Sequence, residues 1–193
     1  HESRCHKKSM SIRKIPEYLR FSHKDLVESD YAPESIINLL ENSVTAHLSI
    51  VVGGQPHAGK TELVKYLSTK IPHNEKAGVY EDNQEIHYRK INPNKKCVEF
   101  FVDDKVTYQD IIKAGLRHNI DWILLSESRG PEVAHLLNSL STGSYCMTTM
   151  HLDEVRDMPD RMYNMLGNSS VNERFINSVY KSGGFASGLV RNW

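Results

Sequence analysis

The chain has 193 residues, which is enough for one well-buried domain with a short N-terminal attachment and too few for two full-sized domains. Its 24 Lys and Arg residues balance its 24 Asp and Glu residues, so net charge gives no reason to expect nucleic acid or an anionic membrane to bind the whole surface. No apolar run approaches the roughly 18 residues that span a bilayer, and the three cysteines are widely spaced, as suits reduced thiols in a cytosolic protein. We therefore expect a soluble protein without a direct nucleic-acid partner.

Residues 1–46 are predicted to be an N-terminal lead-in segment, and residues 47–193 the main domain. The opening stretch "HESRCHKKSMSIRK" is basic but lacks the apolar core of a secretory signal. Further on, "DLVESDYAPESIINLLENS" predicts one or two short helices, because Pro33 suits the first turn of the second helix.

The main domain alternates between apolar, β-rich runs and stretches with helical spacing. The runs predict strands at 47–52, 77–82, 97–102, 121–127 and 145–151, and helices are predicted at 61–70, 108–118 and 132–140. Such alternation predicts an α/β fold with a mostly parallel sheet flanked by helices. The runs "SIVV" and "WILL" are almost continuously apolar, so they are the predicted central strands.

Between the first strand and the first of these helices, "GQPHAGKT" fits the P-loop pattern G-x-x-x-x-G-K-S/T. Its residues are Gly54, Gln55, Pro56, His57, Ala58, Gly59, Lys60 and Thr61. Glycines let backbone N–H groups converge on phosphate oxygens, to which the helix adds its positive end. Lys60 would reach the β- and γ-phosphates of a nucleotide, and the Thr61 hydroxyl would hold Mg²⁺. The alternative is a Gly-rich turn with an exposed lysine.

Two positions of this stretch depart from the commoner pattern. Pro56 removes one N–H donor, and Glu62 puts an acidic group just beyond Thr61, so either residue would lower nucleotide affinity. We count Glu62 among the candidate nucleotide-binding residues, although a carboxylate there also simply stabilises a helix N-terminus.

Candidate catalytic carboxylates follow two other predicted strands. "VYED" presents Glu81 and Asp82, and "WILLSESRG" presents Glu127, where P-loop proteins hold an acid that serves Mg²⁺ or the attacking water. The carboxyl ends of parallel strands form the ligand-binding edge of an open α/β sheet. The alternative for each is a solvated turn acid.

Several motifs together resemble the secretion ATPase superfamily, which comprises type II and type IV secretion, pilus and archaeal-flagellum motors. "ILLSESRGPEVAHLLNSLSTGSYCMTTMH" resembles its Walker B and histidine-box region, and "VYEDNQEI" its acidic box. "SIRKI" resembles the segment before the P-loop in the conjugative or Tad-pilus branch. The motifs occur in the family's order, and the resemblance implies a RecA-like P-loop NTPase fold.

The resemblance also implies roles for individual residues. Lys60 and Thr61 would hold ATP and Mg²⁺, Glu127 would be the Walker B acid and a metal-site residue, and His151 would sense the γ-phosphate. Glu81 would be a catalytic candidate of the acidic box. Three arginines match family positions, Arg117 and Arg129 as catalytic candidates and Arg13 as a residue near the nucleotide. The alternatives are a satisfied core histidine and ordinary surface arginines.

The predicted function is Mg²⁺-dependent ATP hydrolysis by the motor core of a ring-forming secretion, pilus-assembly or conjugation ATPase. By resemblance we expect a homo-oligomer, a hexamer, that works in the cytoplasm at the inner face of the cell membrane with membrane proteins of a transfer apparatus. Asn119 replaces a family arginine, and the chain is short at both ends, which also favours a non-hydrolysing nucleotide-binding scaffold as the alternative. A small-molecule P-loop kinase ranks lower.

Overall fold

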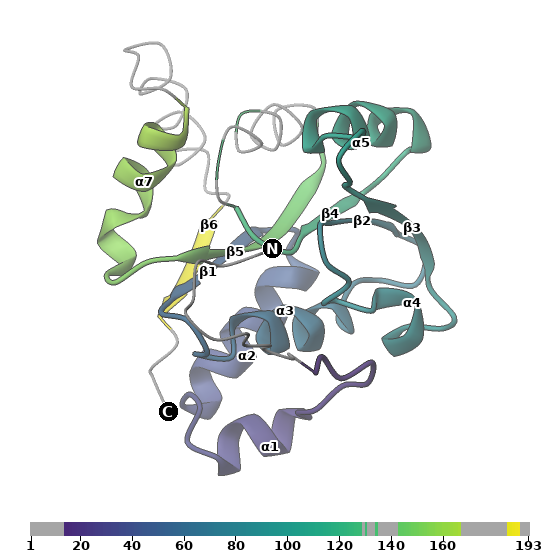
Figure 1. The fold of residues 1–193 in the computed structure, drawn as a ribbon. Coiled ribbons are helices and arrows are strands. Elements are labelled where there is room, and N and C mark those ends of the chain that lie inside the picture. Colours follow the sequence, from purple (N-terminus) through teal and green to yellow (C-terminus); the bar gives the residue numbers. More distant parts are fainter. Residues whose placement is uncertain (1–13, 129, 131–133, 135–142, 167–184, 190–193) are drawn as a thin grey trace, which may run out of the picture.

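The computed structural model describes residues 14–128, 130, 134, 143–166 and 185–189, and its centre is a parallel six-stranded sheet in the order β3-β2-β4-β5-β1-β6 (Figure 1). The strands are β1 (Ser49–Gly54), β2 (Lys76–Glu81), β3 (Lys96–Phe101), β4 (Trp122–Leu125), β5 (Tyr145–His151) and β6 (Phe185–Leu189). The helices are α1 (His23–Glu28), α2 (Glu34–Thr45), α3 (Lys60–Ser68), α4 (Tyr88–Ile91), α5 (Tyr108–Gly115) and α7 (Met158–Met165), with 3-10 turns η1 (Leu116–His118) and η2 (Val155–Asp157).

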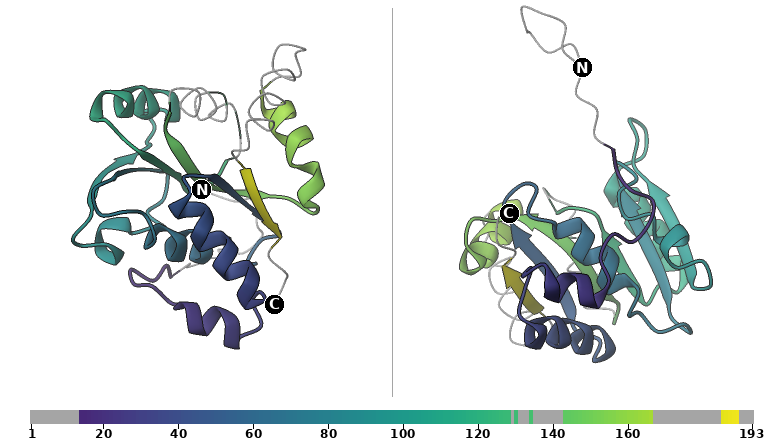
Figure 2. Two further views of the ribbon diagram at one scale, coloured as in Figure 1. Left: turned by 180° about the vertical axis from the view of Figure 1, so that it is seen from behind. Right: turned by 90° about the horizontal axis from the view of Figure 1, so that it is seen from below.

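Helices cover both faces of the sheet. Figures 1 and 2 show α1, α2 and α3 on one face and α5 and α7 on the other. Side chains alternate along β1 accordingly: Ile50 and Val52 join the core under α2 and α3, while Val51 packs with Met158 and Met162 of α7. Because both faces are covered, β1 and β4 are buried along their whole length, as predicted for central strands.

The described part of the lead-in segment shares this core. Ile37, Leu40 and Val44 of α2 and Leu26 of α1 belong to the same buried cluster as the sheet. Ser22 and Asp25 form a reciprocal capping box that starts α1, and Thr107 and Asp110 do the same for α5. The predicted domain boundary between residues 46 and 47 stays a prediction.

The predicted strands are all present, and the segment predicted at 145–151 has the same bounds as β5. The prediction missed β6, whose sequence "FASGL" has small residues and only weak β-propensity; this strand completes the sheet by pairing with β1. It also missed α4 and α7. The predicted helix at 132–140 lies outside the described residues apart from residue 134.

Parallel pairing brings the predicted site residues together at the carboxyl ends of the strands. In the register of β1 and β5, Gly54 lies opposite His151, so the start of the P-loop and the predicted histidine are neighbours. Glu127 follows β4, and β4 pairs with β5 on the side of β5 that faces away from β1. Within the part of the chain that the structure describes, no helix has the length and apolarity to span a bilayer.

Candidate active site

The P-loop backbone turns sharply into α3. Gly59 adopts φ +80°, the left-handed region that glycine tolerates best, and it is the N-cap of α3. A Cβ at this position would lie 3.3 Å from the Tyr31 ring, so the approach of that ring also favours glycine. Lys60 and Thr61 therefore begin α3 at the carboxyl ends of the strands, so the positive N-terminal end of the helix dipole lies there.

Lys60 is buried and folds back over the loop. Its Nζ donates to the backbone carbonyls of Gly54 at 3.0 Å and Gln55 at 2.7 Å, and it lies 3.3 Å from Nδ1 of His151. An ammonium group has only donors, so Nδ1 of His151 accepts and the imidazole proton resides on Nε2.

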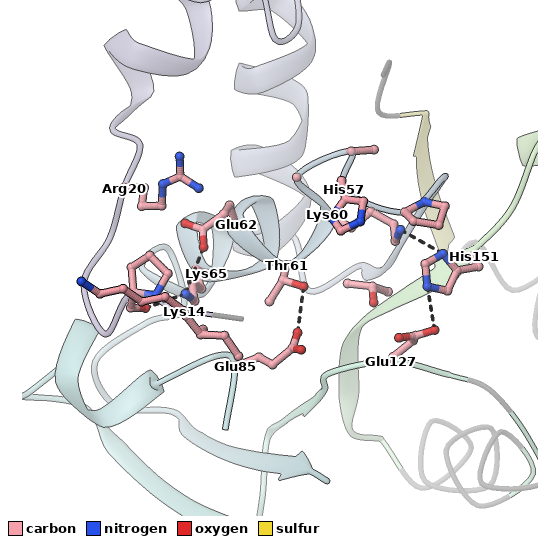
Figure 3. Close-up of a pocket in the computed structure, with 16 residues that line it drawn as sticks. Lys14, Arg20, His57, Lys60, Thr61, Glu62, Lys65, Glu85, Glu127 and His151 are labelled. Atoms are coloured by element: carbon pink, nitrogen blue, oxygen red, sulfur yellow. Dashed lines mark hydrogen bonds and ion pairs between the residues drawn. The ribbon is translucent and has the colours of Figure 1, made fainter. Parts of the chain in front are cut away.

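The same imidazole joins Lys60 to Glu127. Nε2 of His151 lies 3.1 Å from Oε1 of Glu127, which the tautomer makes the acceptor. Lys60, His151 and Glu127 thus form one chain of polar contacts that links the P-loop to the ends of β5 and β4 (Figure 3).

A second carboxylate faces the start of α3. The Thr61 hydroxyl lies 3.3 Å from Oε2 of Glu85, which comes from the loop after β2. The sequence analysis missed Glu85, although the signal was present, because "VYEDNQEI" places a further acid four residues after Glu81. The acid that faces Thr61 therefore comes from the acidic box, but from its later position.

Glu81 lies inside the protein rather than in the pocket wall. Its side chain is 1% exposed, and Oε1 accepts from the backbone N–H groups of Glu85 at 3.0 Å and Ile86 at 2.8 Å. Burial raises the pKa of the Glu81 carboxyl to about 7, although the two N–H bonds act in the opposite direction. Glu81 thus fixes the loop that carries Glu85.

These elements surround a pocket of about 480 Å³. Figure 3 shows Lys60, Glu127 and His151 at one end of it, the lead-in residues Lys14 and Arg20 at the other end, and Thr61 between them. The predicted site residues in its wall are Pro56, His57, Ala58, Gly59, Lys60, Thr61, Glu62, Glu127 and His151. The wall residues that the sequence analysis missed include Lys14, Arg20, Lys65 and Glu85.

The remaining predicted residues lie elsewhere. Gly54 and Gln55 touch the site through their carbonyl groups, which accept from Lys60. Arg117 is exposed in η1 and does not line the pocket. Arg13 and Arg129 lie outside the described residues.

The residue types in the pocket suit a polyphosphate with a divalent cation. Four wall residues are cationic, namely Lys14, Arg20, Lys60 and Lys65. Among the described residues, no group of three or more His, Cys, Asp or Glu side chains could hold a metal ion by itself. Mg²⁺ is usually bound by one or two protein groups together with substrate phosphates, so a hydroxyl and nearby carboxylates fit it better than a full protein cage would.

Comparison with known proteins shows the family to which the chain belongs. A family model described as "Type II/IV secretion system protein" matches residues 4–180. An uncharacterized protein of Bacillus anthracis is 29% identical over 157 residues, which cover 81% of the chain and 35% of that relative. Type IV secretion system protein VirB11 of Bartonella quintana is 28% identical over 141 residues, covering 68% of the chain and 39% of that protein. The chain thus spans well under half of either relative.

Among solved structures, the VirB11 ATPase from the Brucella suis type IV secretion system, determined in complex with sulphate, superimposes with a TM-score of 0.72 at 21% identity. The match covers 92% of the chain and 60% of that structure. This likeness confirms the predicted α/β architecture with a parallel sheet flanked by helices.

Proposed function

Because the chain belongs to the type II/IV secretion system protein family, as its motifs predicted, we propose that it binds Mg²⁺-ATP and hydrolyses it as the core of a secretion, pilus or conjugation motor. The observation that carries the proposal is the polar chain from Lys60 through His151 to Glu127 in the wall of a P-loop pocket. A P-loop lysine at a helix N-terminus binds nucleotide phosphates, and a nearby carboxylate can orient the attacking water, which are two of the roles that phosphoryl transfer needs.

In this proposal the P-loop amides and Lys60 bind the phosphates, and the Thr61 hydroxyl binds the metal. Mg²⁺, when bound, offsets negative charge on the leaving phosphoryl group. Lys60 would exchange its bonds to the carbonyls of Gly54 and Gln55 for phosphate oxygens, which keeps the ammonium hydrogen-bonded in both states.

We propose Glu127 as the residue that orients the attacking water. It lines the pocket and contacts His151, whereas Glu81 is directed into the loop backbone. A carboxylate that orients water must be ionised and reach the pocket. Glu81 is buried outside the pocket wall, and its raised pKa of about 7 keeps part of it protonated near neutral pH. Through its contacts with Lys60 and Glu127, His151 would report whether a γ-phosphate is present.

We further propose that the active form is a homo-oligomer, a hexamer, at the cytoplasmic face of a membrane-bound transfer apparatus. Arg117 is exposed outside the pocket, a position from which it can reach a neighbouring copy. The proposal also assigns Arg13 and Arg129 to the nucleotide site. Arginine from an adjacent subunit is a common way to complete a phosphoryl-transfer site.

The test is phosphate release from ATP with Mg²⁺ at protein concentrations that span assembly, for wild type, Lys60→Ala and Glu127→Gln. The proposal expects activity per subunit to rise with assembly and both variants to lose it, while Glu127→Gln still binds ATP. Binding through Lys60 without hydrolysis at any concentration would instead support the scaffold alternative.

A further inference from the structure

One wall of the pocket is made by residues 14–21, which precede α1. Lys14, Ile15, Pro16 and Arg20 line the pocket from this strap, while Leu19 and Phe21 pack against the main core. Figure 3 shows Lys14 and Arg20 beside the Glu62 and Lys65 side chains of α3. The strap and the P-loop helix therefore form adjoining walls of the pocket.

Lys65 joins these two walls. Its side chain is 0% exposed, and Nζ donates to the backbone carbonyl of Pro16 at 2.9 Å and to Oε1 of Glu62 at 3.0 Å. A lysine is buried only where partners compensate for the lost hydration of its charge. Here the partners are one carboxylate of its own helix and one carbonyl of the strap.

Among the described residues, Lys65 is the side chain that pairs with Glu62. Its second carboxylate oxygen, Oε2, is buried and has no hydrogen bond within the described structure. Glu62 and Lys65 both line the pocket, but the proposed hydrolysis assigns no step to either, so their pairing needs a separate explanation.

The strap has a second polar contact, which is exposed, at the residue after Pro16. Glu17 forms an ion pair with Lys90 of α4, and both side chains are largely exposed. Exposed ion pairs contribute little because water screens them and the side chains lose entropy. Of these two polar contacts of the strap, the buried hydrogen bond from Lys65 to the Pro16 carbonyl should therefore contribute more than the exposed ion pair.

We propose that Lys65 is a positioning residue for the nucleotide site, with Glu62 as the counter-charge that allows its burial. Lys65 holds the Pro16 carbonyl against the helix that begins with Lys60 and Thr61, and so keeps Lys14 and Arg20 in the pocket wall. The effect on ATP affinity rests on the proposed function, whereas the effect on the strap does not.

The test compares wild type with Lys65→Met, the double variant Glu62→Gln/Lys65→Met, and Lys90→Ala as the matched control. The single variant leaves the Glu62 charge buried without a partner, so it is expected to lower the melting temperature. The double variant removes both charges and should melt near the wild-type temperature, which separates folding from positioning. Trypsin cleavage after Arg20 reports how firmly the strap is held.

In the double variant we expect faster cleavage after Arg20 and an ATP dissociation constant raised roughly tenfold, since a charged hydrogen bond is lost. Lys90→Ala should leave the dissociation constant within about twofold of wild type. The kcat at saturating ATP should change less than KM, because Lys65 does not touch the reacting atoms.

If trypsin cleaves after Arg20 in the folded double variant at the wild-type rate, the inference is overturned, whatever the ATP affinity is. Faster cleavage with unchanged ATP affinity would overturn its nucleotide half. If wild type itself binds no ATP, the proposed function fails, and the cleavage rates still decide whether Lys65 positions the strap.

Discussion

The two ends of the sheet each carry a histidine and glutamate pair, and the pairs differ in what surrounds them. At the carboxyl end, His151 lies 3.1 Å from Glu127, with side chains 40% and 16% exposed. At the amino end, His47 lies 2.6 Å from Glu75, with side chains 37% and 14% exposed. Residue type, contact and exposure are therefore nearly the same in both.

The third partners distinguish the pairs. His151 accepts from Lys60 and borders the pocket, whereas the second oxygen of Glu75 accepts from the Trp122 indole at 2.6 Å. His47 also packs against Tyr145, with ring centroids 4.6 Å apart. The comparison teaches that a histidine and glutamate pair becomes a candidate catalytic group when its remaining contacts lead to a cavity, and a structural clamp when they lead to aromatic rings.

The largest expected effect comes from replacing the glutamate of each pair, Glu127 or Glu75, with glutamine. Glu127→Gln should lower ATP hydrolysis roughly a hundred- to a thousandfold, because a water-orienting charge is lost. Glu75→Gln should leave the rate per folded molecule near wild type, because Glu75 lies at the opposite end of the sheet. Phosphate release measures both, and equal losses in the two variants would remove the distinction.

The next largest effect is the pH dependence of stability that the buried carboxyl group of Glu81 creates at the carboxyl end of the sheet. The Glu81 carboxyl has an ordinary pKa of 4.5 and keeps its proton in the folded protein up to about pH 7. The folded state thus binds more protons between these values, and its stability falls as pH rises through this window.

Glu81→Gln should remove this slope, which is on the order of 3 kcal/mol across the window. A glutamine carbonyl can still accept from the N–H groups of Glu85 and Ile86, so the loop should keep its shape. Urea unfolding at several pH values measures the slope, with the exposed Asp82→Asn as control. An unchanged slope in Glu81→Gln would show that Glu81 titrates normally.

A smaller effect is expected from the clamp. Trp122→Phe removes the indole donor and leaves Oε2 of Glu75 without it, which should lower the free energy of unfolding by about 1–3 kcal/mol. ATP hydrolysis at a temperature well below melting should stay near wild type. Denaturant unfolding measures the loss of stability, and phosphate release on the same sample measures the rate of hydrolysis. A large fall in this rate while the protein is fully folded would show that the amino end of the sheet contributes to activity.

The smallest effect is expected for His47→Gln. The polar contact with Glu75 that it removes is partly exposed, so the free energy of unfolding should fall by less than about 1 kcal/mol. His151→Gln is the matched change at the other end, and it should lower hydrolysis while leaving stability similarly unaffected. If His47→Gln lowers the rate as much as His151→Gln does, the third partners do not decide the roles.

The sequence predicted the carboxyl end better than it predicted how that end is held together. The P-loop pattern and Glu127 were found as local motifs at strand ends, and His151 through the resemblance of its segment to the family's histidine box; parallel pairing brings these strand ends together. Lys65 could not be found this way, since its partner is the Pro16 carbonyl, 49 residues earlier. In the sequence it reads as an ordinary surface lysine of an amphipathic helix.

The acidic box illustrates the same limit. Its sequence predicts a catalytic carboxylate at Glu81, but which acid reaches the pocket depends on how the chain leaves β2. Burial of Glu81 under its own loop directs Glu85 toward Thr61, and this follows from tertiary packing. Likewise, β6 was missed because its small residues carry little β-signal, although β1 offers it a partner edge.

The most direct measurement is equilibrium binding of ATP, with and without Mg²⁺, to wild type, Lys60→Ala and Lys76→Ala. Lys76 begins β2 at the amino end of the sheet, so it is the matched lysine away from the pocket. We predict Mg²⁺-dependent binding to wild type and Lys76→Ala and at least roughly tenfold weaker binding to Lys60→Ala, because a charged contact to phosphate is lost. Equal binding by all three proteins, or none by wild type, would contradict the assignment of this pocket to a nucleotide.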